Sequence, residues 1–110
     1  MRPIAFLAAA IVFEVIATAS LRASNGFRNV LPSVVVVIGY GAAFYFLSLC
    51  LQQIPLGVAY AVWSGVGTVL ITLVGVVLYR QALSPAVIAG MALVVLGVVL
   101  INLGSPAVDE

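Results

Sequence analysis

The stretch AIVFEVIATAS, residues Ala10 to Ser20, carries one glutamate in the middle of a run that is otherwise apolar or small. The run extends over residues 4–21, which is long enough for a helix to cross the hydrocarbon core of a bilayer. Glu14 lies about two residues from the centre of this span, roughly 3 Å along the helix axis, so its side chain cannot reach either membrane surface. The stretch therefore predicts a membrane helix with a carboxyl group at mid-depth.

The whole chain shares this apolar character. Of its 110 residues, 65% are hydrophobic and only 6% are charged, a composition that no soluble domain of this size tolerates on its surface. Apolar windows long enough to span a membrane occur at residues 4–21, 34–51, 57–79 and 86–103. We expect an all-α membrane protein whose single domain, residues 1–110, consists of four transmembrane helices. The short loops require antiparallel neighbours, which favours a compact four-helix bundle.

A secretory signal peptide is the alternative for the first window. Arg2, the apolar run and the small residues Ala17-Thr18-Ala19 resemble the three regions of such a signal. Glu14, however, interrupts the apolar core that a signal needs, and cleavage would leave three helices and no domain to export. We therefore expect the first helix to remain part of the protein.

Turn and capping residues separate the windows. They are Ser24-Asn25-Gly26, Pro32 in the first turn of the second helix, Gln52-Gln53-Ile54-Pro55, Ser84-Pro85 at the start of the fourth helix, and Gly104-Ser105-Pro106 at its end. The loops on one side carry Arg22, Arg28 and Arg80, against Arg2 on the other. Under the positive-inside rule this small bias favours cytoplasmic loops on the arginine-rich side, and it permits insertion in both directions.

The composition excludes several classes of function. Lysine is absent, so the phosphate-binding motif GxxxxGK[ST] of ATP-driven proteins does not occur. Histidine is also absent and Cys50 is the only cysteine, so we expect neither a metal site nor an intrachain disulfide. One membrane carboxyl group without a nucleophile, metal or second acid–base group does not make an enzyme. We also expect no organic cofactor and no nucleic-acid partner.

Glu14 has no cationic partner in the sequence. A charge at the centre of a membrane helix costs about 2.5–3.5 kcal/mol on insertion scales, and no Arg or Lys occurs in another window to offset it. The partner of Glu14 is then a proton or a bound cation, as is typical of a transport site. The alternative is that Glu14 is permanently protonated and serves only as a hydrogen-bonding packing residue. The side chains on its helix face, expected to line a ligand pocket, are those of Leu7, Ala10, Ala17 and Thr18, of which Thr18 can donate a hydrogen bond to the carboxylate.

Aromatic side chains occur at membrane depth in two other windows. Tyr60 and Trp63 share one face of the third window, in the segment AYAVWSGVG, and Tyr40 and Phe44 share one face of the second. Because ring faces attract cations, these residues predict the wall of a site for flat lipophilic cations, with Glu14 as the counter-charge. Simple packing of the bundle is the alternative for all four rings.

Small residues mark the third and fourth windows. Ser64 is expected to line the site. Gly65 and Gly67 predict a hinge that switches the site between the two membrane faces, with close helix packing as the alternative. In the fourth window, Gly90 and Gly97 belong to a stripe of small residues on a helix without charged or aromatic side chains. Such a stripe is typical of helix association.

Over its whole length the chain resembles the small multidrug resistance family of bacterial transporters. The segments that carry the resemblance are FEVIATASL at residues 13–21, SNGF at 24–27, IPLGVAYAVWSGVG at 54–67 and IAGMALVVLGVVLINL at 88–103. A membrane glutamate alone does not identify the family, but few other proteins would combine such a glutamate with the segment AYAVWSGVG at this distance.

The resemblance implies proton-coupled export of lipophilic and quaternary ammonium cations across the bacterial inner membrane, with the proton gradient as the energy source. It implies an antiparallel, dual-topology homodimer in which Glu14 of both protomers binds either protons or substrate. The further residues to which it assigns roles are Tyr40, Tyr60 and Trp63 in the pocket and Gly90 and Gly97 on the dimerising face.

Two departures from the family's patterns bear on substrate class. Guanidinium exporters of the family typically carry a Trp shortly after the glutamate and a Lys at the end of the fourth helix, whereas this chain has Val15-Ile16-Ala17 and Ile101-Asn102-Leu103. These sequences favour the multidrug branch. Ile4 stands where some drug exporters have an aromatic residue, which predicts an altered pocket wall and a narrower substrate range. Guanidinium export by the same fold and a non-transporting subunit of a heterodimer stay as alternatives.

Overall fold

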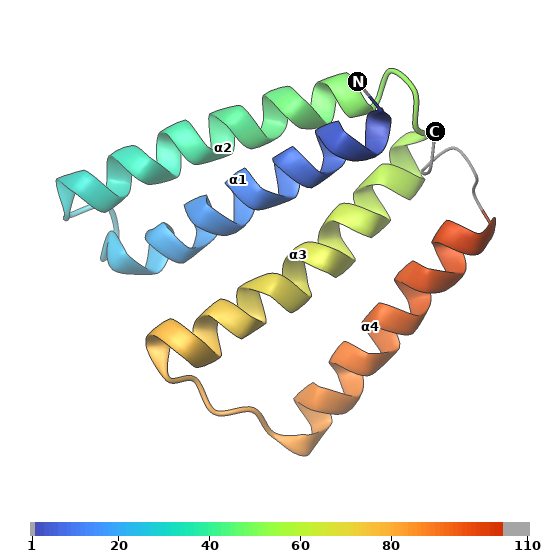
Figure 1. Cartoon of the computed structure of the whole chain (residues 1–110). Coiled ribbons are helices and arrows are strands. Elements are labelled where there is room, and N and C mark those ends of the chain that lie inside the picture. The colour runs from blue at the N-terminus through green and yellow to red at the C-terminus, as the bar shows by residue number, and fades with distance from the viewer. Residues whose placement is uncertain (1, 105–110) are drawn as a thin grey trace.

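Four long helices make up most of the computed structural model, which describes residues 2–104 (Figure 1). Helix α1 spans Pro3–Ala23, α2 spans Val30–Cys50, α3 spans Leu56–Tyr79 and α4 spans Pro85–Gly104. Each helix is long and apolar enough to cross a membrane. The predicted all-α fold with four transmembrane helices is therefore confirmed.

The helix ends follow the local sequence. Asn25, Gly26 and Phe27 all have positive φ and form the turn after α1, where a turn was predicted. The Ser84 side-chain oxygen accepts a hydrogen bond from the Val87 backbone N–H at 3.2 Å and caps α4, as its position before a proline indicates. The predicted stop after α4 lies mostly outside the described residues.

Helix α2 begins at Val30, earlier than the apolar window that starts at Val34. Asn29 precedes it in an extended conformation, and Pro32 lies in the first turn, where its missing N–H leaves no helical hydrogen bond unmade. The helix starts early because a hydropathy window detects the lipid-buried part of a helix, whereas the helical backbone continues through less apolar residues such as Ser33.

The helices form an open and flat array (Figure 1), so the expectation of a compact bundle is wrong for the single chain. Helix α1 packs along α2 and also contacts α3, and α4 packs chiefly on α3. The Cα atoms extend over 42 × 35 × 17 Å, and α4 has no buried residue. Short loops set which helices are neighbours but do not curve the array into a bundle, because lipid chains solvate an apolar helix face as well as another helix does.

Two glycines set the distance between neighbouring helices. A Cβ atom on Gly39 of α2 would lie 2.8 Å from the Cβ of Ala17 on α1. Gly65 of α3 is in contact with Val98 of α4, where a Cβ atom would overlap the valine side chain. Small residues at these two positions therefore permit the close α1–α2 and α3–α4 contacts.

The core lies where α1, the end of α2 and the start of α3 meet. It consists of Leu7, Ala10, Ile11, Leu47, Cys50, Ile54, Ala59 and Val62. Phe46 stacks on Phe13 beside it, with ring centroids 5.7 Å apart. Cys50 is fully buried in this cluster, where it acts as a small packing residue. The core holds α1 against α3 at the end next to the α2–α3 loop, and Glu14 lies beyond it toward the middle of the helices.

Candidate functional site

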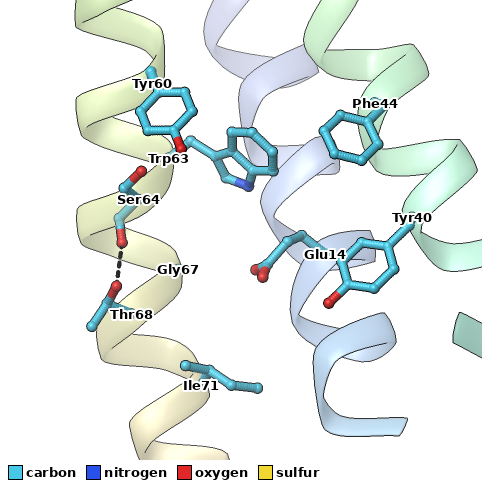
Figure 2. A pocket seen from close by; sticks show the side chains of 9 residues that line it. All are labelled: Glu14, Tyr40, Phe44, Tyr60, Trp63, Ser64, Gly67, Thr68 and Ile71. Atoms are coloured by element: carbon cyan, nitrogen blue, oxygen red, sulfur yellow. Dashed lines mark hydrogen bonds between the residues drawn. The ribbon is translucent and has the colours of Figure 1, made fainter. Parts of the chain in front are cut away.

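A cavity of about 310 Å³ lies between α1, α2 and α3 at the level of Glu14 (Figure 2). Its lining residues are Glu14 from α1, Tyr40 and Phe44 from α2, and Tyr60, Trp63, Ser64, Gly67, Thr68 and Ile71 from α3. In Figure 2 the Glu14 carboxyl group and the Trp63 indole point from opposite helices into the same space. The structure thus brings together the carboxylate and the four aromatic residues that the sequence assigns to one site; their binding role stays a prediction.

One oxygen of the Glu14 carboxyl group is held by a hydrogen-bonded chain. The Thr18 hydroxyl donates to Glu14 Oε1 at 2.8 Å, and the Tyr40 hydroxyl lies 2.6 Å from Thr18 Oγ1. A hydroxyl group has one proton to donate, so Thr18 accepts from Tyr40 while it donates to Glu14. The chain joins α2 to α1 and fixes the orientation of the carboxyl group.

The other carboxyl oxygen has no such partner. Glu14 Oε2 is buried and makes no hydrogen bond to the described residues. It lies next to Gly67, where an added Cβ atom would be 3.3 Å away. A buried polar atom without a partner costs about 1–3 kcal/mol; a bound cation would supply a partner, and a proton would remove the charge of the carboxylate. None of the described residues that line the cavity is basic.

Trp63 is held between two other rings of the cavity wall. Its ring centroid lies 5.7 Å from that of Phe44 and 5.8 Å from that of Tyr60, and both contacts are edge-to-face. This geometry suits the quadrupoles of aromatic rings. Tyr60 is 59% exposed and Phe44 is 55% exposed, so the aromatic wall is open on one side within the single chain.

Three small or apolar residues predicted to line the pocket lie elsewhere. Leu7 and Ala10 belong to the core, and Ala17 packs against Gly39 of α2; all three have at most 1% of their surface exposed. They share the helix face of Glu14, but most of that face is covered by neighbouring helices. Ile4 is also absent from this cavity and lines a separate one at the start of α1.

The α3 face of the cavity contains residues that the sequence analysis did not assign to it. Thr68 and Ile71 line it, one helical turn after Ser64 and Gly67, and this spacing was the signal for them. Gly67, predicted only as a hinge or packing residue, also lines it. Helix α3 is continuous through Gly65 and Gly67, so a hinge there stays a prediction.

The glycines assigned to dimerisation lie on α4, which packs chiefly on α3. An added Cβ atom on Gly90 or Gly97 of α4 would meet no atom within 4 Å, so this face is open in the single chain. Among residues 2–104, no group of three or more His, Cys, Asp or Glu side chains is arranged to hold a metal ion.

Comparison with known proteins places the chain in a family. The family model described as "Small Multidrug Resistance protein" matches residues 2–94. The chain is 58% identical to the quaternary ammonium compound-resistance protein QacE of Escherichia coli over 102 residues, which cover 93% of each protein. It is 57% identical to a putative ethidium bromide resistance protein of Pseudomonas aeruginosa over 90 residues, covering 82% of this chain and 78% of the relative.

A third relative is the multidrug resistance protein EbrA of Bacillus licheniformis, 54% identical over 98 residues, which cover 89% of this chain and 93% of the relative. These three are named as resistance proteins, and none as an enzyme. With its four membrane-spanning helices, the chain is a multi-pass protein of the bacterial inner membrane. It belongs to the small multidrug resistance family.

Proposed function

We propose that the chain is a proton-coupled antiporter that exports lipophilic and quaternary ammonium cations, with Glu14 as the group for which proton and cation compete. The observation that carries this proposal is the unpartnered Oε2 of Glu14 beside an aromatic cavity without a basic side chain. The relatives named for resistance to quaternary ammonium compounds and to ethidium support this class of substrate.

The exchange follows from competition for one charge. Ionised Glu14 attracts a cation strongly in the low dielectric of the bilayer, and the ring faces of Trp63 and Tyr60 add cation–π attraction. Protonation of Glu14 removes the charge and releases the cation. Because a cation and a proton cannot occupy Glu14 together, export of the cation is coupled to import of protons. Each elementary charge that crosses 100 mV contributes about 2.3 kcal/mol.

A second, antiparallel copy of the chain completes the site in this proposal. The open side of the aromatic wall, at Tyr60 and Phe44, would expose a bound cation to lipid in a single chain. Helix α4 has no buried residue, and its Gly90 and Gly97 leave room for another helix. An antiparallel pair would form an inverted repeat with one Glu14 from each protomer, the arrangement typical of alternating-access transporters.

Transport in vesicles tests the proposal. Purified protein in vesicles with an imposed pH gradient should move ethidium against its gradient, and Glu14→Gln, which keeps the shape of the side chain but not its charge, should abolish movement. Tyr45→Phe is the matched control, since Tyr45 is 61% exposed and does not line the cavity. Ethidium movement that persists in Glu14→Gln would overturn the proposal.

The same vesicles separate the alternatives. Proton-coupled flux of guanidinium without ethidium movement would identify a guanidinium exporter, although the aromatic wall favours a larger and flatter cation. Ethidium movement that required a second, different chain would identify a subunit of a heterodimer. We expect the single purified chain to suffice.

A further inference from the structure

A second, smaller cavity lies directly beyond Thr18, toward the end of the molecule that carries the α1–α2 and α3–α4 loops. Its volume is about 120 Å³, and its polar lining comes from Thr18, Arg22, Tyr79 and Gln81. Ile71 lines both this cavity and the Glu14 cavity. Thr18 connects the two chemically, because its hydroxyl donates to Glu14 Oε1.

The outer end of the small cavity is covered by a contact between α1 and α3. The Tyr79 hydroxyl donates a hydrogen bond to the backbone carbonyl of Ala19 at 2.7 Å. The guanidinium carbon of Arg22 lies 5.0 Å from the centroid of the Tyr79 ring, a cation–π contact. Arg22 itself is exposed at the surface, so these two contacts lie at the boundary between the cavity and the outside.

This contact is much weaker than the one at the other end of the α1–α3 cleft. There the apolar core around Leu7 and Ile54 holds the helices together with fully buried side chains. Here only one hydrogen bond and one cation–π contact at an exposed arginine join the helices, and each is weak compared with a buried apolar cluster. The end at Tyr79 therefore separates more readily than the end at the core.

The size of the small cavity suits protons carried by water and not drugs. Its 120 Å³ holds a few water molecules, each of which takes about 30 Å³ in the liquid, but not a drug-sized cation. Two titratable groups line this cavity, Arg22 on α1 and the phenol of Tyr79 on α3. The phenols of Tyr40 on α2 and Tyr60 on α3 line the cavity of Glu14, and no described residue of α4 contributes a titratable group to either cavity.

We propose that the small cavity is a water-filled chamber through which protons, but not drug cations, reach Glu14, and that Tyr79 is its gate. This inference rests on the proposed function. When a hydronium ion in the chamber passes a proton to Thr18 Oγ1 and becomes a neutral water, the Thr18 hydroxyl passes its own proton to Glu14 Oε1. The threonine is unchanged, the hydronium ion has lost one proton and the carboxylate has gained it; release follows the reverse order.

Proton leak without drug tests the gate. Tyr79→Phe keeps the ring over which Arg22 lies but removes the hydrogen bond to Ala19. Vesicles that contain this variant and a pH-sensitive dye should acidify several-fold faster than wild-type vesicles after the external pH is lowered. The affinity of the variant for tetraphenylphosphonium should change less than twofold. Tyr45→Phe removes the hydroxyl of an exposed tyrosine that lines neither cavity, and this variant should leak like the wild type.

Variants of Thr18 test the route. In the Tyr79→Phe background, Thr18→Val should return the leak to the wild-type rate, whereas Thr18→Ser should keep it high. A leak in Tyr79→Phe no faster than in Tyr45→Phe would overturn the gate, and an undiminished leak after Thr18→Val would overturn the route. Wild-type exchange of ethidium for protons in the same vesicles is measured separately; its failure would overturn the proposed function instead.

Discussion

Glu14 Oε2 and Gly67 face each other across the α1–α3 cleft so closely that a Cβ atom at residue 67 would lie 3.3 Å from the oxygen. The missing side chain permits this close approach of the carboxyl oxygen to α3 at the cavity wall. Glycine is thus needed at this position for close approach, whether or not α3 bends there.

We predict that Gly67→Ala weakens binding of tetraphenylphosphonium roughly 3- to 10-fold, equivalent to about 0.7–1.4 kcal/mol. The added methyl group would displace an oxygen whose carboxyl group is already fixed by Thr18. Gly41→Ala is the matched control, because a Cβ atom there meets nothing within 4 Å. Equilibrium binding in detergent measures both, and equal affinities for the two variants would contradict the predicted contact.

The hydrogen-bonded chain from Tyr40 through Thr18 to Glu14 should contribute to the free energy of unfolding. Tyr40→Phe removes one hydrogen bond and should cost about 1 kcal/mol in the free energy of unfolding, measured by denaturant unfolding in micelles. Thr18→Val removes both bonds and should cost more. Because the two residues share one bond, Tyr40→Phe should cost little in the Thr18→Val background. Fully additive losses would show that the hydroxyls act independently.

Trp63 should contribute most to the binding of flat cations. Trp63→Ala removes the ring held between Phe44 and Tyr60 and should weaken ethidium binding roughly 10- to 30-fold, while Trp63→Phe should lose less because a ring face remains. Phe6→Leu alters an aromatic ring outside the cavity and should leave the affinity unchanged. If Trp63→Ala and Phe6→Leu bound ethidium alike, the rings would serve packing alone.

The α3–α4 contact offers a rescue experiment. A Cβ atom at Gly65 would overlap the Val98 side chain, so Gly65→Ala should lower the thermal unfolding temperature. Val98→Ala creates space at that point and should recover most of the loss in the double variant. Absence of rescue would mean that Gly65 matters for the flexibility of α3 instead of for this contact.

Much of the fold was predictable because its determinants are local. Length and hydropathy identify the four spans, and Ser84-Pro85 marks the start of α4 from capping chemistry alone. The apolar window begins after the start of α2 at Val30, because apolarity marks depth in lipid and not helical backbone; Pro32, expected in the first turn, is the residue that indicated the earlier start. The flat array was missed because nothing in the sequence of α4 indicates whether its partner is this chain, a second copy or lipid.

The candidate site was predictable in its chemistry but not in its boundaries. Glu14 and Trp63 stand out because each is costly or unusual at mid-membrane, and the structure places both on one cavity. Helical periodicity gave Ala10 and Ala17 the same face as Glu14, but it does not tell which part of a face a neighbouring helix covers. The contact between Tyr79 and Ala19 joins residues far apart in sequence, so only the fold reveals it.

Binding of tetraphenylphosphonium across a pH series tests the central claim, that proton and cation compete for Glu14. For the wild type, the affinity should fall as the pH is lowered, because protonation removes the charge that holds the cation. Glu14→Gln should bind weakly and with no pH dependence. A wild-type affinity that does not change with pH, or a Glu14→Gln variant that binds like the wild type, would contradict the account.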